Sequence, residues 1–117
     1  MSVQRLHVSS RFSEIAISGH LVHLAGQLAS DFDLDIYGQT QQTLDIIDQF
    51  LLEAGTDKRH IMSVTIYLKD IERDYAAFNQ VWDQWVADIE ALPRTCVEAK
   101  LYDPRVLVEM TVVAVKP

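Results

Sequence analysis

One acidic side chain in this sequence lies among apolar neighbours, where burying a charge costs free energy. Glu109 interrupts the apolar run 106–113, with Val108 and Met110 on either side. A carboxylate among such neighbours shifts its pKa upward or recruits a partner, and such carboxylates act as general bases or position water. Two interpretations stay open here, a catalytic carboxylate and one half of a structural ion pair at a subunit interface.

A second group of candidates follows Pro93. The guanidinium of Arg94 can hold a carboxylate through two parallel hydrogen bonds, although an arginine after a proline is a weak signal by itself. Cys96 lies two residues further on and would share a strand face with Arg94, so a thiol nucleophile is conceivable. Because no histidine is near it in sequence, a buried cysteine acting as a small apolar residue is favoured.

Patterns for a metal or a cofactor are missing from the sequence. Its single cysteine excludes an internal disulfide and a multi-cysteine metal site. The run 31–35 imitates the start of a calcium loop, but Ile36 and Gln42 occupy the positions that need glycine and glutamate. No Gly-rich phosphate-binding loop is present either. These residues therefore give no support for a metal site or for a phosphate-bearing cofactor.

Length and charge restrict the class of protein. A chain of 117 residues with 49% hydrophobic and 23% charged residues fits one globular domain, 1–117. The formal charge of −7 repels phosphate backbones, so we expect no nucleic-acid partner. Apolar stretches are far shorter than the roughly 20 residues that span a bilayer, and the N-terminus lacks a secretory core. We expect a cytoplasmic protein with no membrane contact.

Apolar periodicity predicts the elements that position these residues. Alternation and β-branched residues predict strands at 3–8, 14–17, 21–27, 61–69, 94–101 and 106–115. A first helix is expected between Tyr37 and Gly55, and a second one carries a single apolar stripe. That stripe consists of Tyr75, Phe78, Trp82, Trp85 and Ile89. The order βββαβαββ predicts an α+β fold with both helices on one face of the sheet.

The last two predicted strands bear on the site and on the assembly. A turn at 102–105 would let them pair antiparallel, with Arg94 near the far end of the last strand. That strand carries apolar residues on both faces, with Val108 and Val112 on one and Val113 and Val115 on the other. Two helices cover only one face, so we expect the second face to pack against copies of the chain.

With these features assembled, the sequence resembles the RidA/YjgF family of reactive-intermediate (enamine/imine) deaminases over residues 11–115. The motifs are individually weak but specific as an ordered set. They are Leu24-Ala25-Gly26-Gln27, the runs 40–44 (TQQTL), 53–55 (EAG), 64–70 (VTIYLKD), 75–79 (YAAFN), 93–99 (PRTCVEA) and 108–115 (VEMTVVAV).

The resemblance implies a chorismate-mutase-like, RidA-like domain that forms a homotrimer around a central barrel, with clefts at the subunit interfaces. It also implies cofactor-free hydrolysis of short 2-imino or enamine acids to 2-oxo acids and ammonia. Arg94 would hold the substrate carboxylate and Glu109 would position the attacking water. Backbone groups at Cys96 would assist, Gly26 would leave room in the cleft wall, and Asn79 would support the site.

One departure from the family pattern concerns Phe12. Many deaminating members carry a tyrosine at this point, so the phenolic hydroxyl is missing here. A noncatalytic module that binds small carboxylates is therefore an alternative function. An endoribonuclease, a role also attached to this family, ranks last because the chain is acidic and lacks a His/Lys cluster.

Overall fold

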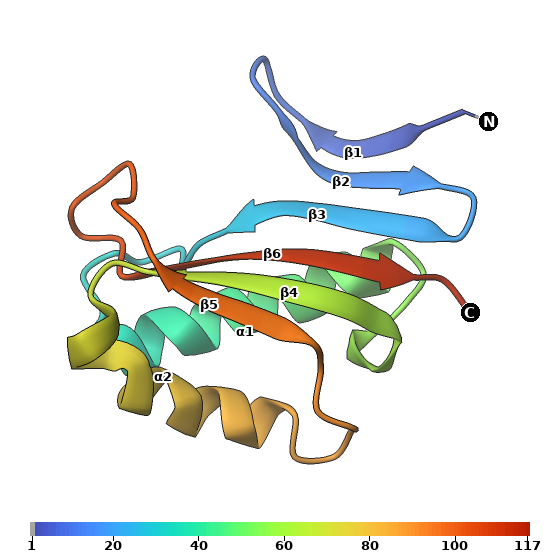
Figure 1. The fold of residues 1–117 in the computed structure, drawn as a ribbon. Coiled ribbons are helices and arrows are strands. Elements are labelled where there is room, and N and C mark those ends of the chain that lie inside the picture. The colour runs from blue at the N-terminus through green and yellow to red at the C-terminus, as the bar shows by residue number, and fades with distance from the viewer. Residues whose placement is uncertain (1) are drawn as a thin grey trace.

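Six strands form one sheet in the order β1-β2-β3-β6-β4-β5, and both helices lie on the same face of it (Figure 1). The computed structural model describes residues 2–117. Its elements are β1 (Gln4–Val8), β2 (Ser13–Ser18), β3 (Leu21–Gln27), α1 (Ile36–Glu53), the short 3-10 turn η1 (Lys58–His60), β4 (Ile61–Leu68), α2 (Ile71–Trp85), β5 (Arg94–Glu98) and β6 (Val108–Val115). The predicted α+β class, element order and single helical layer are confirmed.

The apolar strand β6 lies in the interior of the sheet, antiparallel to β3 on one side and to β4 on the other. Its alternate residues Val108, Met110, Val112 and Ala114 are buried on the face that the helices cover. A strand with one fully buried row of side chains is most stable at the centre of a sheet, because its backbone then also pairs with a neighbouring strand on each side.

Helix α1 has clear signals at both ends. The Asp35 carboxylate accepts a hydrogen bond from the Gly38 backbone N–H at 3.0 Å and caps the first turn. After the C-cap residue, Gly55 takes a φ of 86°, a left-handed conformation that ends helices and favours glycine. Between these ends, Leu44, Ile47 and other apolar side chains are fully buried against the sheet.

Helix α2 is shorter than the apolar stripe in the sequence indicates. It ends at Trp85, so Ile89 lies outside the helix, contrary to the prediction. The helix ends there because the following residues lead back to the sheet. At the sheet, the Pro93 carbonyl accepts a hydrogen bond from the Val64 N–H. Tyr75 is not a core residue either, since 43% of its surface is exposed. Neither helix of the described chain is long and apolar enough to cross a membrane.

The predicted hairpin between the last two strands is wrong. β5 pairs in parallel with β4, with Arg94 opposite Val64, and β4 separates β5 from β6. Parallel strands need a long crossover connection, and α2 provides one between β4 and β5. The loop after β5 then carries the chain past β4 to the centre of the sheet, where β6 buries its row of apolar side chains on the helical face.

Among residues 2–117, no layer covers the face of the sheet opposite the helices. Glu109, Thr111 and Val113 project from β6 on this face and are half-buried among their neighbours. Tyr67 and Thr65 of β4 pair with two of these positions and belong to the same face. We call it the open face.

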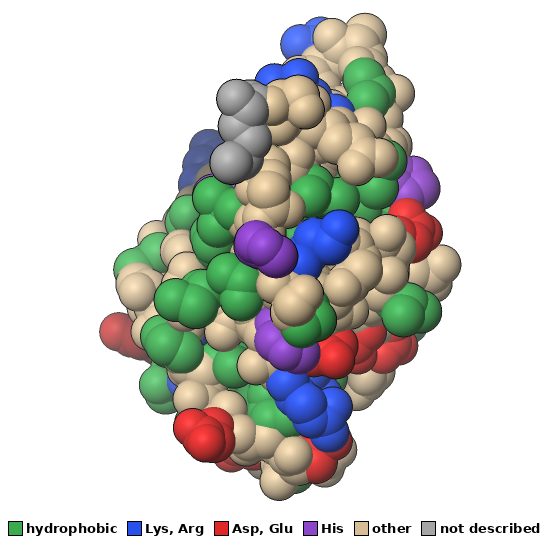
Figure 2. Space-filling view, turned by 90° about the vertical axis from the view of Figure 1, so that its right-hand side faces the viewer, with side chains coloured by type: hydrophobic (Ala, Val, Ile, Leu, Met, Phe, Trp, Pro, Cys, Tyr) green, Lys and Arg blue, Asp and Glu red, His purple; other side chains and the backbone are tan. Residues whose placement is uncertain are grey.

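The side of the molecule where the C-terminus emerges mixes several kinds of side chain. Figure 2 shows apolar, basic, acidic and histidine side chains interleaved on that side. This side of the described chain has no continuous basic surface of the kind that holds a phosphate backbone.

Candidate functional site

Glu109 lies on the open face because its neighbours Val108 and Met110 are fully buried on the helical face. Its carboxylate packs directly on the backbone of Gly26, where a Cβ atom would come within 2.2 Å of Oε2. The bulge between Leu24 and Gln27 brings Gly26 to this place. Any side chain at position 26 would displace the Glu109 carboxylate.

Loss of hydration sets the protonation chemistry of Glu109. Burial raises the pKa of its carboxyl above the usual value for glutamate. A carboxylate with a raised pKa accepts a proton more readily, which suits a general base working near neutral pH.

Arg94 lies on the helical face of the sheet, beside α2. Its Nη2 donates to Asn79 Oδ1 at 2.8 Å and to the Tyr75 hydroxyl at 3.3 Å. The guanidinium carbon is 5.1 Å from the ring centroid of Trp82, within the range of a cation–π contact. Among the described residues, Nη1 of Arg94 is one of two buried side-chain polar atoms without a hydrogen-bond partner. The arginine is thus held firmly and keeps an unused donor, which an anion can accept from.

Cys96 shares the face of Arg94, as its spacing predicted, and pairs with Ile66 in the parallel register. Burial raises the pKa of its thiol, and the charge of Arg94 opposes this only in part. The thiol therefore stays protonated near neutral pH and is a poor nucleophile. This result favours the interpretation of Cys96 as a small apolar residue.

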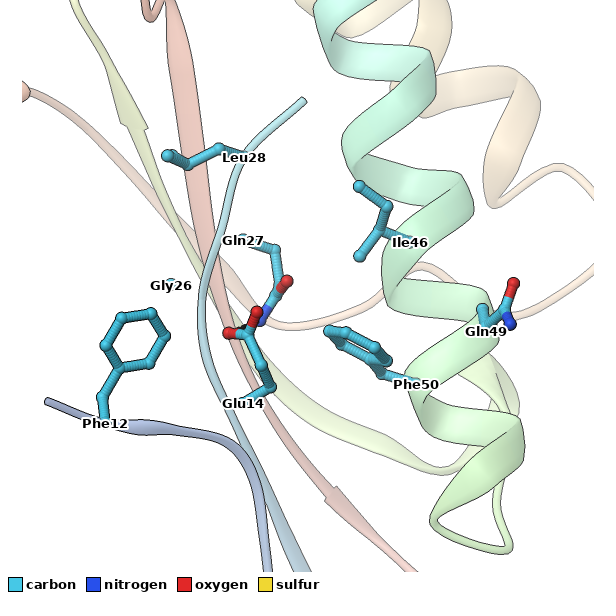
Figure 3. Close-up of a pocket in the computed structure, with 8 residues that line it drawn as sticks. All are labelled: Phe12, Glu14, Gly26, Gln27, Leu28, Ile46, Gln49 and Phe50. Atoms are coloured by element: carbon cyan, nitrogen blue, oxygen red, sulfur yellow. Dashed lines mark hydrogen bonds between the residues drawn. The ribbon is translucent and has the colours of Figure 1, made fainter. Parts of the chain in front are cut away.

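Phe12 lies beside Gly26 at the wall of a cavity of about 330 Å³ between the sheet and α1 (Figure 3). We call this space the Gly26 cavity. It is lined by Phe12, Glu14, Gly26, Gln27, Leu28, Ile46, Gln49 and Phe50. Phe12 is 55% exposed, so its ring borders the opening rather than the core.

A single chain does not bring Arg94 and Glu109 together. Arg94 is level with Val64 of β4, whereas Glu109 is level with Tyr67 on the other side of the same strand. Their side chains also leave the sheet on opposite faces. The candidate site is therefore divided into two halves: Arg94 with Asn79 and Cys96 form the arginine half, and Glu109 with Gly26 and Phe12 form the glutamate half.

Two residues of these halves were missed by sequence reasoning. Tyr75 contacts Arg94. It lies four residues before Asn79 and therefore on the same side of α2, so its place beside the arginine could have been predicted from the sequence. Glu14 enters the Gly26 cavity near the start of β2, and nothing in the local sequence marks it.

The layered α+β sheet, with an arginine on the edge strand and a glutamate on the central strand, defines a protein of the RidA-like class. The comparisons make this more specific: the chain belongs to the RidA/YjgF family, and its residues 2–116 match the family model described as Endoribonuclease L-PSP. The related proteins are named only as members of the RutC family. A RutC family protein of Haemophilus ducreyi is 42% identical over 112 residues, which cover 96% of this chain and 95% of the relative. The RutC family protein YoaB of Escherichia coli is 35% identical over 114 residues, covering 97% of this chain and 98% of YoaB.

Solved structures agree with the fold over the whole chain. The crystal structure of an uncharacterized protein from Pseudomonas aeruginosa is similar with a TM-score of 0.94 and 44% identity, and covers 99% of this chain and 100% of that one. A member of the YjgF protein family from Neisseria meningitidis has a TM-score of 0.94 and 38% identity, with coverage of 100% and 97%. These relatives establish the family and the fold, and their names state no substrate.

Proposed function

We propose that the chain is a cofactor-free hydrolase that deaminates short 2-imino or enamine acids at clefts between copies of itself. In each cleft the arginine half comes from one copy and the glutamate half from its neighbour. The observation that carries the proposal is the half-buried, firmly held Arg94, whose buried Nη1 has no hydrogen-bond partner among the described residues. A guanidinium in this state is suited to a small carboxylate.

The residues support a simple reaction. Nη1 of Arg94 donates to the substrate carboxylate and fixes the imine carbon near Glu109 of the neighbouring copy. Glu109 accepts a proton from water while the water oxygen bonds to the imine carbon. That proton then passes to the imine nitrogen and gives a carbinolamine. Glu109 next transfers the hydroxyl proton of the carbinolamine to the amine, so the carbon–nitrogen bond breaks as the carbonyl forms, and ammonia and a 2-oxo acid are released. This hydrolysis does not change the oxidation state of the substrate, so it needs no redox cofactor.

The open face supports the proposed assembly. It carries half-buried residues such as Thr111 and Val113 that no helix covers. Burying apolar area contributes roughly 25 cal/mol per Å², which favours association of such a face with further copies. A homotrimer around a central barrel is the arrangement we propose. The single free cysteine suits a reducing compartment, and the cytoplasm is the place we propose for it.

Mixing two inactive variants tests the shared site directly. Arg94→Ala and Glu109→Gln are purified separately, mixed under conditions that exchange subunits, and assayed for ammonia release from imines generated in situ. Each variant alone should be nearly inactive, because every cleft lacks one half. In randomly mixed assemblies about one site in four combines an intact Arg94 with an intact Glu109, so about a quarter of the wild-type rate should return.

The controls separate the site from the chemistry. Mixing Arg94→Ala with itself after the same treatment should restore nothing. If wild-type protein releases no ammonia from any 2-imino acid, the deaminase proposal is lost. If the wild type is active but mixing restores no activity, Arg94 and Glu109 do not meet across an interface.

A noncatalytic carboxylate-binding module is the second candidate, and Phe12 favours it because the phenylalanine provides no hydroxyl at the cleft. Calorimetric binding of a small 2-oxo acid, weakened by Arg94→Ala and without any turnover of imines, would support this alternative. The acidic charge of −7 keeps an endoribonuclease last among the candidates.

A further inference from the structure

The Gly26 cavity combines two aromatic rings with a carboxylate. Phe12 precedes β2 and Phe50 belongs to α1. The Glu14 carboxylate and the Phe50 ring lie on the α1 side of β3, and the Phe12 ring lies on the other side of that strand (Figure 3). At about 330 Å³ the cavity is large enough for the side chain of a small ligand. Aromatic faces and a carboxylate together are suited to an organic cation.

Glu14 is poorly satisfied within the chain. Gln27 Nε2 donates to its Oε1 at a long 3.3 Å, and the same Nε2 also donates to the Ala25 carbonyl at 2.9 Å. The lining of the cavity includes no lysine or arginine. A neutral apolar ligand would remove water from this carboxylate without replacing its hydrogen bonds, which is costly. A cation would replace them and gain the attraction of the charge.

The cavity adjoins the proposed reaction centre. Gly26 lines the cavity, and the Glu109 carboxylate packs on the same glycine. Glu109 reaches Gly26 from the open face, whereas the cavity lies toward α1. A molecule whose reacting carbon lies at Glu109 would therefore have to pass the edge of β3 at Gly26 before its other end enters the cavity.

We propose that the Gly26 cavity binds a positively charged side chain of the substrate, a guanidinium or ammonium group held by Glu14 beside Phe50, with Phe12 at the opening of the cavity. The favoured substrates are then 2-imino acids with a cationic tail. This inference rests on the proposed function, since it specifies the substrate class of the same site. The net charge of −7 acts in the same direction by attracting cations.

Arginine and citrulline provide a matched pair of probes, because they differ mainly in the charge at the end of the side chain. Imines are generated in situ from each amino acid by a separate oxidase, and kcat/KM is measured for the wild type. Binding of the two unoxidised amino acids is measured by calorimetry as a readout independent of turnover. We expect the arginine compound to be favoured at least about tenfold in both measurements.

Glu14→Gln is the decisive variant, since it removes the charge and keeps an oxygen that can accept from Gln27. It should abolish the preference for arginine, so that the values of kcat/KM for the arginine and citrulline imines come within about twofold of each other. Asp83→Asn is the control: it removes the same charge from an exposed position on α2, outside the cavity lining, and should preserve the preference.

The outcomes distinguish this inference from the proposed function. Equal treatment of arginine and citrulline by the wild type, or a preference that survives Glu14→Gln, would overturn the cation site even if imines are hydrolysed. Glu14-dependent binding of arginine without hydrolysis of any imine would support the cation site and reject the deaminase.

Discussion

Glu109 loses hydration in the folded chain, and this loss raises the pKa of its carboxyl. A general base must be ionised to work, so activity should rise with pH through this raised pKa and level off above it. The acid limb should lie above pH 4.5, the ordinary value for the group. The profile of kcat/KM against pH measures it.

The raised pKa of Glu109 affects stability in the opposite direction from activity: activity rises with pH, whereas stability falls. A carboxyl whose pKa is raised by folding binds its proton more tightly in the native state, so its contribution to stability falls as the pH rises through that interval. Glu109→Gln should therefore lower kcat by about 10²- to 10⁴-fold while causing no loss of stability near neutral pH. A variant that keeps the wild-type rate would remove Glu109 from the mechanism.

Among elements, the two helices are joined by a polar contact in addition to apolar packing. The indole Nε1 of Trp85 donates to both carboxylate oxygens of Asp48, at 3.1 Å and 3.0 Å. Burial raises the pKa of Asp48, while the hydrogen bond from Trp85 opposes this shift. The ionised carboxylate thus depends on the indole for part of its stabilisation.

Trp85→Phe removes that donor and leaves Asp48 without it. We expect a loss of about 1–3 kcal/mol in the free energy of unfolding, measured by urea denaturation near neutral pH. The loss should shrink in acid, where Asp48 is protonated in both states. Asp48→Asn and the double variant complete a thermodynamic cycle, and strict additivity of the two changes would contradict a direct coupling.

The order of elements could be predicted from local signals, but the pairing of strands could not. Apolar periodicity and Gly55 were enough to predict α1, because a helix is determined largely within its own segment. The turn at 102–105 indicated a hairpin, yet β5 pairs with β4. Pairing depends on which strand gains most from the centre of the sheet, and that competition involves the whole chain.

For the candidate site, too, some features could be predicted from the sequence and others could not. Asn79 contacts Arg94, and Gly26 contacts Glu109, and the family resemblance had named all four residues. The placement of Arg94 and Glu109 on opposite faces was not readable, because it follows from the position of β4 between their strands. Glu14 was missed because a lone carboxylate near a strand start has no distinctive spacing.

For the whole molecule, we propose that the open face forms the interface between copies of the chain. Thr111 projects from the centre of this face and pairs with Thr65 of β4. Thr111→Lys would place a charge in the proposed interface, and a buried charge without a partner costs several kcal/mol. We expect sedimentation analysis to show a trimer for the wild type and mainly monomers for this variant, with imine hydrolysis lost in parallel.

A matched control comes from an exposed position outside that face. Gln84→Lys, on the outer surface of α2, adds the same charge and should leave both the trimer and the activity intact. A wild-type protein that sediments as a monomer and still hydrolyses imines would contradict the shared cleft.

The division of Arg94 and Glu109 between two faces of one sheet also governs how many sites an assembly can hold. Two copies joined head to tail complete one cleft and leave one arginine and one glutamate without a counterpart. Closing the ring with a third copy uses every half, so the number of clefts equals the number of chains. Dilution that opens the ring should therefore lower the activity per chain before it unfolds any of them.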